Sequence, residues 1–158
     1  ITKLFFVTWI DTPTDEEDLD LALEQMKYAF DNVLYENIDK LTYEDKLNLF
    51  TSVWKKYDPS PSSPGNGFQD KYYRRVRFAN EEFTRYKDGW RTDRGMIYIL
   101  FGAPNQVFYN DFISSGNASQ QWVYFSNAIA FTFYDDHNTG DFQLREPYDY
   151  EPFTRPIK

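Results

Sequence analysis

The spacing of apolar residues changes once along this chain, and that change constrains the fold more than any other feature. Between residues 15 and 87 the apolar positions recur every three or four residues, which is typical of helices that bury one face. From residue 96 onward, short apolar runs and alternating patterns replace that spacing and indicate strands. Helices followed by consecutive strands predict an α+β fold, with three main helices followed by an antiparallel sheet of three to four strands.

Capping residues and breakers set the expected helix limits. Three helices are predicted, at residues 15–35, 43–57 and 69–87. Thr14 and Glu17 have the spacing of a capping box for the first helix, and Thr42 precedes the second with Asp45 three residues on. The prolines and glycines of Asp58–Gly67 break both helix and strand, so this segment is expected to be a loop.

The second half of the chain predicts the sheet. Strands are expected at residues 96–101, 121–125, 128–135 and 141–145. Met96–Phe101 is a short, continuous apolar run, which favours a buried central strand. Gly102–Pro104 is expected to turn the chain, residues 110–120 to form a polar loop, and residues 136–140 to form a hairpin turn.

The 158 residues suit one domain with one core. We expect that domain at residues 11–146, followed by a proline-rich surface tail at residues 147–158. Residues 1–10 are β-rich and predict a strand that ends an upstream β-rich domain or forms an edge here. The abrupt start at Ile1 suggests a piece of a longer protein, with any targeting signal outside it.

Charge and composition exclude several classes of partner and site. The formal net charge of −8 argues against general binding to nucleic acid, and one basic cluster, Lys71–Arg77, is the local exception. Because the chain has no cysteine, disulfides, thiolate metal sites and cysteine nucleophiles are excluded. No apolar run approaches the length of a membrane-spanning helix.

Several ordered blocks carry a family resemblance. They read FTSVWKKYDPSPSSPGN, YYRRVRFANEEF, GWRTDRGMIYILFGAPN, QWVYF and FTFYDDHNTGDFQL. Together they resemble the GWxTD domain family, whose motif stands here as Gly89, Trp90, Arg91, Thr92 and Asp93. The resemblance covers about Phe5 to Leu144. It departs from the family after the proline-rich loop, where Gly67 follows Asn66 in place of the usual glutamate.

The resemblance implies an exported protein or lipoprotein of the cell envelope, since family members occur mainly in Bacteroidetes and related bacteria. A periplasmic or outer-membrane location and another envelope protein as partner are therefore expected. No cofactor is expected, and carbohydrate is an alternative ligand that depends on the aromatic residues considered below. The family has no settled activity, so no catalytic residue is assigned. A weaker, fold-level likeness is to outer-membrane assembly lipoproteins of the BamE type, on Gly102–Pro104 and Trp122–Tyr124.

GWRTDRG is the first candidate site. In the structural interpretation, Gly89 is the left-handed residue after the third helix, Trp90 anchors the connection, and Thr92 and Asp93 stabilise a turn. Gly95 permits positive φ or close approach to a neighbour. The segment then joins the third helix to the central strand. In the functional interpretation, Asp93 and nearby arginines, Arg94 among them, form a pocket for a carboxylate or an enzyme site.

The arginines at positions 74, 75 and 77 are the second candidate. Helical spacing prevents Arg74, Arg75 and Arg77 from all facing one way, so at least one of the three should point toward the sheet. A half-buried arginine usually has a carboxylate partner, which predicts an Arg–Asp brace between the third helix and Asp93.

The hairpin turn is a weak candidate for calcium. Its oxygen ligands would be Asp135, Asp136, Asn138 and Asp141. The twelve-residue calcium-loop pattern is absent, and the same residue types are ordinary turn formers. His137 is the only histidine, which excludes any site with two histidine ligands.

Aromatic residues make up 20% of the chain and supply the last candidate. Trp122 and Tyr124 share one strand face, so they either lie in a core under the helices or form an exposed platform with Tyr109 for sugar or peptide binding. Three functions therefore stay open. They are a non-enzymatic interaction or scaffold module of an envelope protein, a carbohydrate- or peptide-binding module, and a hydrolase-type enzyme centred on Asp93.

Overall fold

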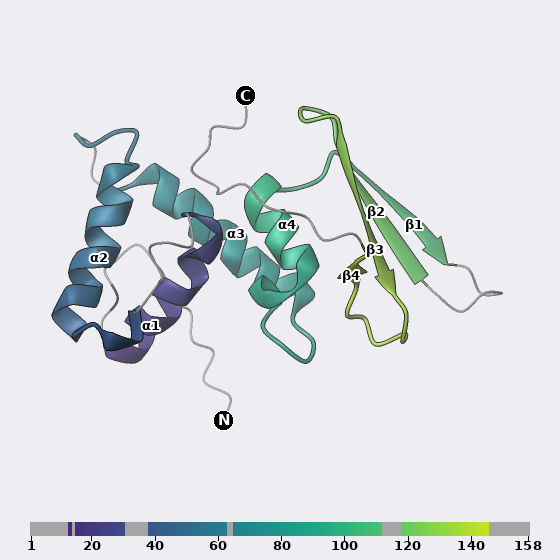
Figure 1. Ribbon diagram of the computed structural model, residues 1–158. Helices are drawn as coiled ribbons and strands as arrows, with labels where there is room; N and C mark the ends of the chain where they lie inside the picture. The colour runs from purple at the N-terminus through teal and green to yellow at the C-terminus, as the bar shows by residue number, and fades with distance from the viewer. Residues whose placement is uncertain (1–12, 14, 31–37, 63–64, 112–117, 146–158) are drawn as a thin grey trace. The chain divides into compact units, whose positions relative to one another are not determined.

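The computed structural model describes residues 13, 15–30, 38–62, 65–111 and 118–145. Within them the chain forms two compact units (Figure 1). The first contains the described residues up to 27 and from 38 to 73, and the second contains residues 28–30 and those from 74 onward. Helices followed by an antiparallel sheet confirm the α+β class. The predicted segments at 1–10, 31–35 and 147–158 lie outside the described residues.

The first unit is helical. It holds α1 (Glu16–Gln25), the short 3-10 helix η3 (Ile38–Lys40), α2 (Tyr43–Lys56) and the first part of α3 (Gly67–Phe83), while η1 (Met26–Tyr28) follows α1 directly. Thr42 caps α2 as predicted, because its hydroxyl oxygen accepts the N–H of Asp45 at 3.2 Å. The cap of α1 is instead Asp15, whose carboxylate accepts the N–H of Asp18 at 2.9 Å.

Trp54 is the centre of this unit's core. Its ring lies 5.5 Å from the rings of both Tyr72 and Tyr73 on α3. Asn66 connects the same two helices, since its amide nitrogen donates to the carbonyl of Trp54 at 2.7 Å. The amide oxygen of Asn66 accepts the N–H of Phe68, so this asparagine also caps the start of α3.

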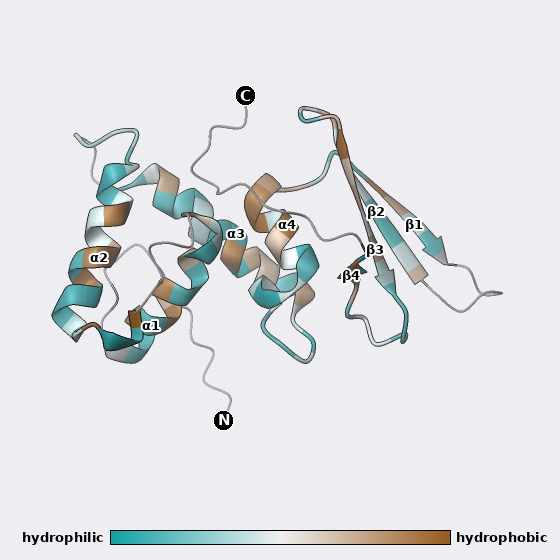
Figure 2. Cartoon of the chain, in the orientation of Figure 1, coloured by the Kyte–Doolittle hydropathy of each residue, from teal (hydrophilic) through white to brown (hydrophobic). Residues whose placement is uncertain are grey.

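In the second unit, the segment predicted to be a central strand is a helix, so that prediction is wrong. Met96–Phe101 belongs to α4 (Asp93–Phe101), a helix that follows the 3-10 turn η4 (Gly89–Arg91). Thr92 caps α4, Asp93 lies in its first turn, and Gly102 ends it with a φ of 82°. Figure 2 shows hydrophobic residues concentrated on this helix. The third helix also ends earlier than predicted, at Phe83.

The sheet is an antiparallel meander in the order β1-β2-β3-β4, with β1 at one edge (Figure 1). Its strands are β1 (Gln106–Asp111), β2 (Ala118–Tyr124), β3 (Ile129–Asp135) and β4 (Gln143–Leu144). The first of these was not predicted, and the predicted polar loop at 110–120 overlaps the end of β1 and the start of β2. The other three strands fall within or beside their predicted ranges.

One face of the sheet packs into the core of the second unit. Trp122 pairs across the strands with Phe131, and its ring lies 5.6 Å from that of Phe83 on α3. Phe101 of α4 lies 5.1 Å from Phe131 and 5.3 Å from Tyr124, measured between ring centroids. This face therefore buries aromatic rings against two helices, and the opposite face carries Gln121, Val123 and Thr132.

Candidate functional site

Position 89 requires glycine because its backbone lies very close to the backbone of α3. An added Cβ at this position would lie 1.9 Å from the carbonyl oxygen of Ala79 on α3. Its φ is not positive, so the predicted left-handed helix end is wrong, and the residue instead opens η4. Gly95 has the same requirement, with an added Cβ 1.9 Å from the carbonyl oxygen of Gly89. The two glycines thus let α3, η4 and α4 pack backbone against backbone.

Trp90 holds this connection in the core. It is buried, and its N–H donates to the side-chain oxygen of Asn80 on α3 at 3.0 Å. The phenol of Tyr28 donates to the carbonyl of Trp90 at 3.2 Å, and the two rings meet edge to face. All of these contacts are structural, as the anchoring interpretation of Trp90 predicts.

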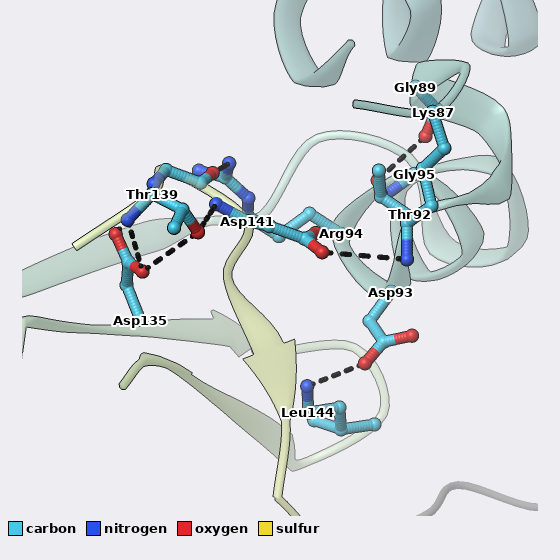
Figure 3. A network of polar contacts seen from close by, with 11 residues as sticks. Lys87, Gly89, Thr92, Asp93, Arg94, Gly95, Asp135, Thr139, Asp141 and Leu144 are labelled. Atoms are coloured by element: carbon cyan, nitrogen blue, oxygen red, sulfur yellow. Dashed lines mark hydrogen bonds and ion pairs between the residues drawn. The ribbon is translucent and has the colours of Figure 1, made fainter. Parts of the chain in front are cut away.

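The hydroxyl of Thr92 stabilises the turn between η4 and α4 both as a donor and as an acceptor. Its hydroxyl donates to the carbonyl of Gly89 at 2.7 Å and accepts the N–H of Gly95 at 3.0 Å (Figure 3). The first bond fixes η4 and the second caps α4, so one side chain joins the two elements. The segment joins α3 to α4, not to a strand.

Asp93 connects the start of α4 to β4. Its carboxylate accepts the backbone N–H of Leu144 at 2.7 Å, and it also lies at the positive end of the helix dipole (Figure 3). Within the described part of the chain it forms no ion pair with an arginine, so the predicted Arg–Asp brace is wrong. A partly exposed carboxylate held by one backbone amide resembles a structural link more than a catalytic acid.

Arg75 has a different partner from the one predicted. Its guanidinium donates to the carbonyls of Ile99 and Leu100, at 2.7 and 2.9 Å, and so caps the C-terminal end of α4. Burial lowers the pKa of Arg75, although its ordinary value is so high that the group stays charged. Gly102 leaves room for this side chain, because an added Cβ would lie 2.8 Å from an Arg75 nitrogen.

Tyr124 completes the same end of α4. Its phenol donates to the carbonyl of Gly102 at 2.9 Å. Burial raises the pKa of Tyr124, with the Arg75 charge opposing the change, so the hydroxyl stays protonated and keeps its donor role. Only 4% of Trp122 and 4% of Tyr124 is exposed, which contradicts a binding platform at these two rings.

Arg94 lies between two aromatic rings. Its guanidinium carbon is 5.0 Å from the ring centroid of Phe83 and 4.5 Å from that of Phe142, and 8% of the residue is exposed. One terminal nitrogen donates to the carbonyl of Gly140 at 2.8 Å. Its Nε is buried with no hydrogen-bond partner among the described residues.

The calcium candidate is a hydrogen-bonded turn. Asp135 is buried and accepts the backbone N–H groups of Thr139 and Gly140 at 2.9 and 2.7 Å (Figure 3). Asp136 pairs with Arg145, Asp141 lies 3.7 Å from Lys87, and Asn138 has a φ of 52°. In the part of the chain that the structure describes, no group of three acidic or histidine residues is arranged to hold a metal ion.

The pKa of Asp135 reflects two opposed effects. Burial alone would raise it, but hydrogen bonds from the backbone of Gly140, Thr139 and His137 outweigh burial and hold the pKa below its ordinary value. The carboxylate is therefore stabilised in its charged form by the turn it organises. His137 itself is exposed in this turn.

Three exposed aromatics of the second unit lie on β1 or directly after β2. Phe108 and Tyr109 of β1 are 54% and 68% exposed, and Phe125 after β2 is 59% exposed. Phe108 pairs with Gln121 and Tyr109 with Gln120, so the two β1 rings project on opposite faces. They flank the edge strand of the described sheet, whereas a flat platform would need both rings on one face. Of the predicted platform, only Tyr109 is exposed.

Comparison with known proteins identifies the family of this chain. Its sequence matches the GWxTD domain over residues 12–156, nearly the full length. The chain belongs to the GWxTD domain family. No curated protein and no solved structure matches it. The signature of the GWxTD domain is thus the segment whose glycines, tryptophan and threonine join α3 to α4 here.

Sequence reasoning identified the signature but missed several roles. The N-terminal cap of α4 had a visible signal, since Thr92 directly precedes Asp93 and an apolar run. The roles of Arg75 and Asn66 had none, because their partners are backbone carbonyls of other elements. Among the described residues, no helix is long and apolar enough to cross a membrane.

Proposed function

We propose that this GWxTD domain is a non-enzymatic interaction module of an exported or cell-envelope protein, and that it binds an extended segment of a protein partner along β1. The observation that carries the proposal is the edge strand β1, beside which no further strand pairs among the described residues. Strand β1 is an edge strand whose two aromatic side chains are exposed. An extended peptide can add to such an edge through backbone hydrogen bonds.

Strand β1 lacks the features that usually protect an edge. Its six residues, Gln106–Asp111, include no lysine, arginine or proline. Its register with β2 runs without interruption from Gln106 opposite Val123 to Asp111 opposite Ala118, so no bulge twists it away. Since proteins commonly protect exposed edges with such features, their absence favours an edge that is covered by a partner.

The residues that would support an enzyme are engaged in the fold. Asp93 holds the backbone of Leu144, Thr92 joins η4 to α4, and Arg75 caps α4. These contacts favour a structural role for the signature segment, which is why the proposal assigns binding to the sheet edge. Another protein of the cell envelope is the proposed partner.

Site-specific photocrosslinking tests this proposal. A photoreactive phenylalanine analogue would replace Phe108 or Tyr109 in the full protein in its native host, and Tyr43 would be the control position. Tyr43 is 38% exposed and begins α2 in the first compact unit. We expect crosslinks to one envelope protein from positions 108 and 109, and none from position 43.

The pattern of crosslinks decides the outcome. Equal crosslinking from all three positions would indicate nonspecific proximity and contradict the proposal. Failure of positions 108 and 109 to crosslink at all, in cells where the protein is abundant, would also contradict it.

A further inference from the structure

Two arginines of the second unit meet at Gly140. The carbonyl of Gly140 accepts a hydrogen bond from Arg94, and an added Cβ on the same glycine would lie 3.1 Å from Nε of Arg85. The φ of +79° at Gly140 gives the glycine a conformation that other residues rarely adopt. Both side chains therefore lie beside the same residue, Gly140.

Neither arginine is neutralised by a direct ion pair within the described residues. The side chain of Arg85 is exposed and makes one hydrogen bond, to the carbonyl of Thr84 at 2.7 Å. The nearby carboxylates are engaged elsewhere, since Asp135 accepts two backbone N–H groups and Asp141 lies 3.7 Å from Lys87. Arg85 thus keeps its Nε and one terminal nitrogen, and these can donate two parallel bonds to one anion.

The electrostatics agree with this geometry. Burial lowers the pKa of Arg94, and the neighbouring positive charge of Arg85 lowers it further. Two like charges held together destabilise each other, and an anion bound beside them would relieve that repulsion. Asp141 and Asp135 act in the opposite direction and raise the pKa of Arg94, so a bound anion would add to a partial compensation of the two arginine charges.

Arg94 contacts the strand that pairs with the proposed binding edge. A terminal nitrogen of Arg94 is 3.4 Å from the side-chain oxygen of Gln120, and Gln120 is the direct cross-strand partner of Tyr109 on β1. The phenol of Tyr109 raises the pKa of Arg94. Arg94 is therefore on the same face of the sheet as Tyr109, one strand in from the edge, and Arg85 lies beside it at Gly140.

We infer that Arg85 and Arg94, with Tyr109 beside them, bind a carboxylate of the partner, so that the segment added along β1 is an acidic peptide. Arg85 contacts the aspartate or glutamate side chain directly, and Arg94 adds its charge from the core. This inference rests on the proposed function, because it names the chemistry of the segment that β1 receives.

Selection from a library of random twelve-residue peptides tests it. The domain in its full chain is used as the target, alongside Arg85→Glu and the control Arg77→Glu. Arg77 is an exposed arginine of α3 in the same unit, so it matches the charge change but not the position. We expect wild type and Arg77→Glu to select peptides with a recurrent acidic residue, and Arg85→Glu to bind them about tenfold more weakly.

A charge swap in the selected peptide completes the test. Replacing its acidic residue by lysine should weaken binding to wild type and restore binding to Arg85→Glu, a coupling that nonspecific attraction would not produce. Selected peptides without acidic enrichment, or an undiminished affinity for Arg85→Glu, would overturn the carboxylate site while leaving the edge intact. Selection of no peptide, or of peptides whose binding survives Phe108→Ser together with Tyr109→Ser, would contradict the proposed function and this inference with it.

Discussion

Gly89 shows how one residue without a side chain can define a motif. Its backbone lies so close to Ala79 that a methyl group would overlap the carbonyl oxygen, at 1.9 Å. We expect Gly89→Ala to lower the free energy of unfolding by about 3 kcal/mol or more, because relief of the overlap requires α3 and η4 to separate. Chemical denaturation followed by circular dichroism measures the change.

Gly67→Ala is the matched control for this prediction. An alanine Cβ at Gly67 would meet no atom within 4 Å, and the residue begins α3. Its stability should rise or fall by less than about 1 kcal/mol, since alanine favours helix and reduces the freedom of the unfolded chain. A Gly89→Ala variant as stable as Gly67→Ala would show that the close approach is not required.

The carboxylate of Asp135 should make the stability of the fold depend on pH. Because its pKa is lowered in the folded state, its contribution to stability is complete above the unfolded value near 4 and is lost as the pH falls through the folded value. Asp135→Asn should therefore lower stability at pH 7 by about 2 kcal/mol, through loss of charge-assisted hydrogen bonds, and the difference should shrink below about pH 4.

Urea denaturation at several pH values measures this dependence. Asp136→Asn is the control, because Asp136 is exposed and its ion pair with Arg145 lies at the surface. It should change stability by less than about 1 kcal/mol. A difference between wild type and Asp135→Asn that stays constant from pH 7 to pH 3 would contradict the assigned role of the carboxylate.

Among the elements, α4 shows most clearly what the sequence leaves open. The run Met96–Phe101 has the composition of a buried strand, and a run this short has no readable period. Contacts from outside the run stabilise the helical form. Thr92 caps the first turn of α4, and the guanidinium of Arg75 donates to the last carbonyls. A local pattern cannot predict the second contact, because the partner comes from another helix.

Strand β1 was missed for the opposite reason. Its sequence, QVFYND, is polar and follows a turn, so it looks like a loop until β2 is present to pair with it. The longer α2 and α3 were predicted well, since their periodicity extends over several turns. Of the candidate site, the joining role of Gly89 to Gly95 was predictable from residue types. The absence of an ion pair between Asp93 and any arginine of the described residues was not.

Arg75 provides the prediction at this scale. Arg75→Met keeps much of the apolar stem but removes the donors to Ile99 and Leu100. Loss of charged hydrogen bonds at a helix end should lower the free energy of unfolding by about 2 kcal/mol. Thermal denaturation of the neighbouring Arg74→Met, whose side chain is exposed, should match wild type within about 0.5 kcal/mol. Equal effects of the two substitutions would exclude Arg75 as the cap of α4.

At the scale of the whole molecule, α3 contributes residues to both compact units. Tyr72 and Tyr73 belong to the core around Trp54, whereas Val76, Ala79 and Phe83 are buried in the second unit. An α-helix gains most of its stability from the packing of its apolar face. Loss of either core would therefore remove the support of half of α3, which predicts that the two units unfold together.

Hydrogen exchange of core variants tests this cooperativity. Phe133→Ala opens a cavity in the second unit and Phe50→Ala opens one in the first, each at a cost of about 3–5 kcal/mol. If α3 couples the units, both variants should accelerate exchange in α2 and in β3 by similar factors, because the most protected amides exchange through global unfolding. Faster exchange confined to β3 in Phe133→Ala, with α2 unchanged, would show instead that α3 can lose one half of its packing while the other half stays folded.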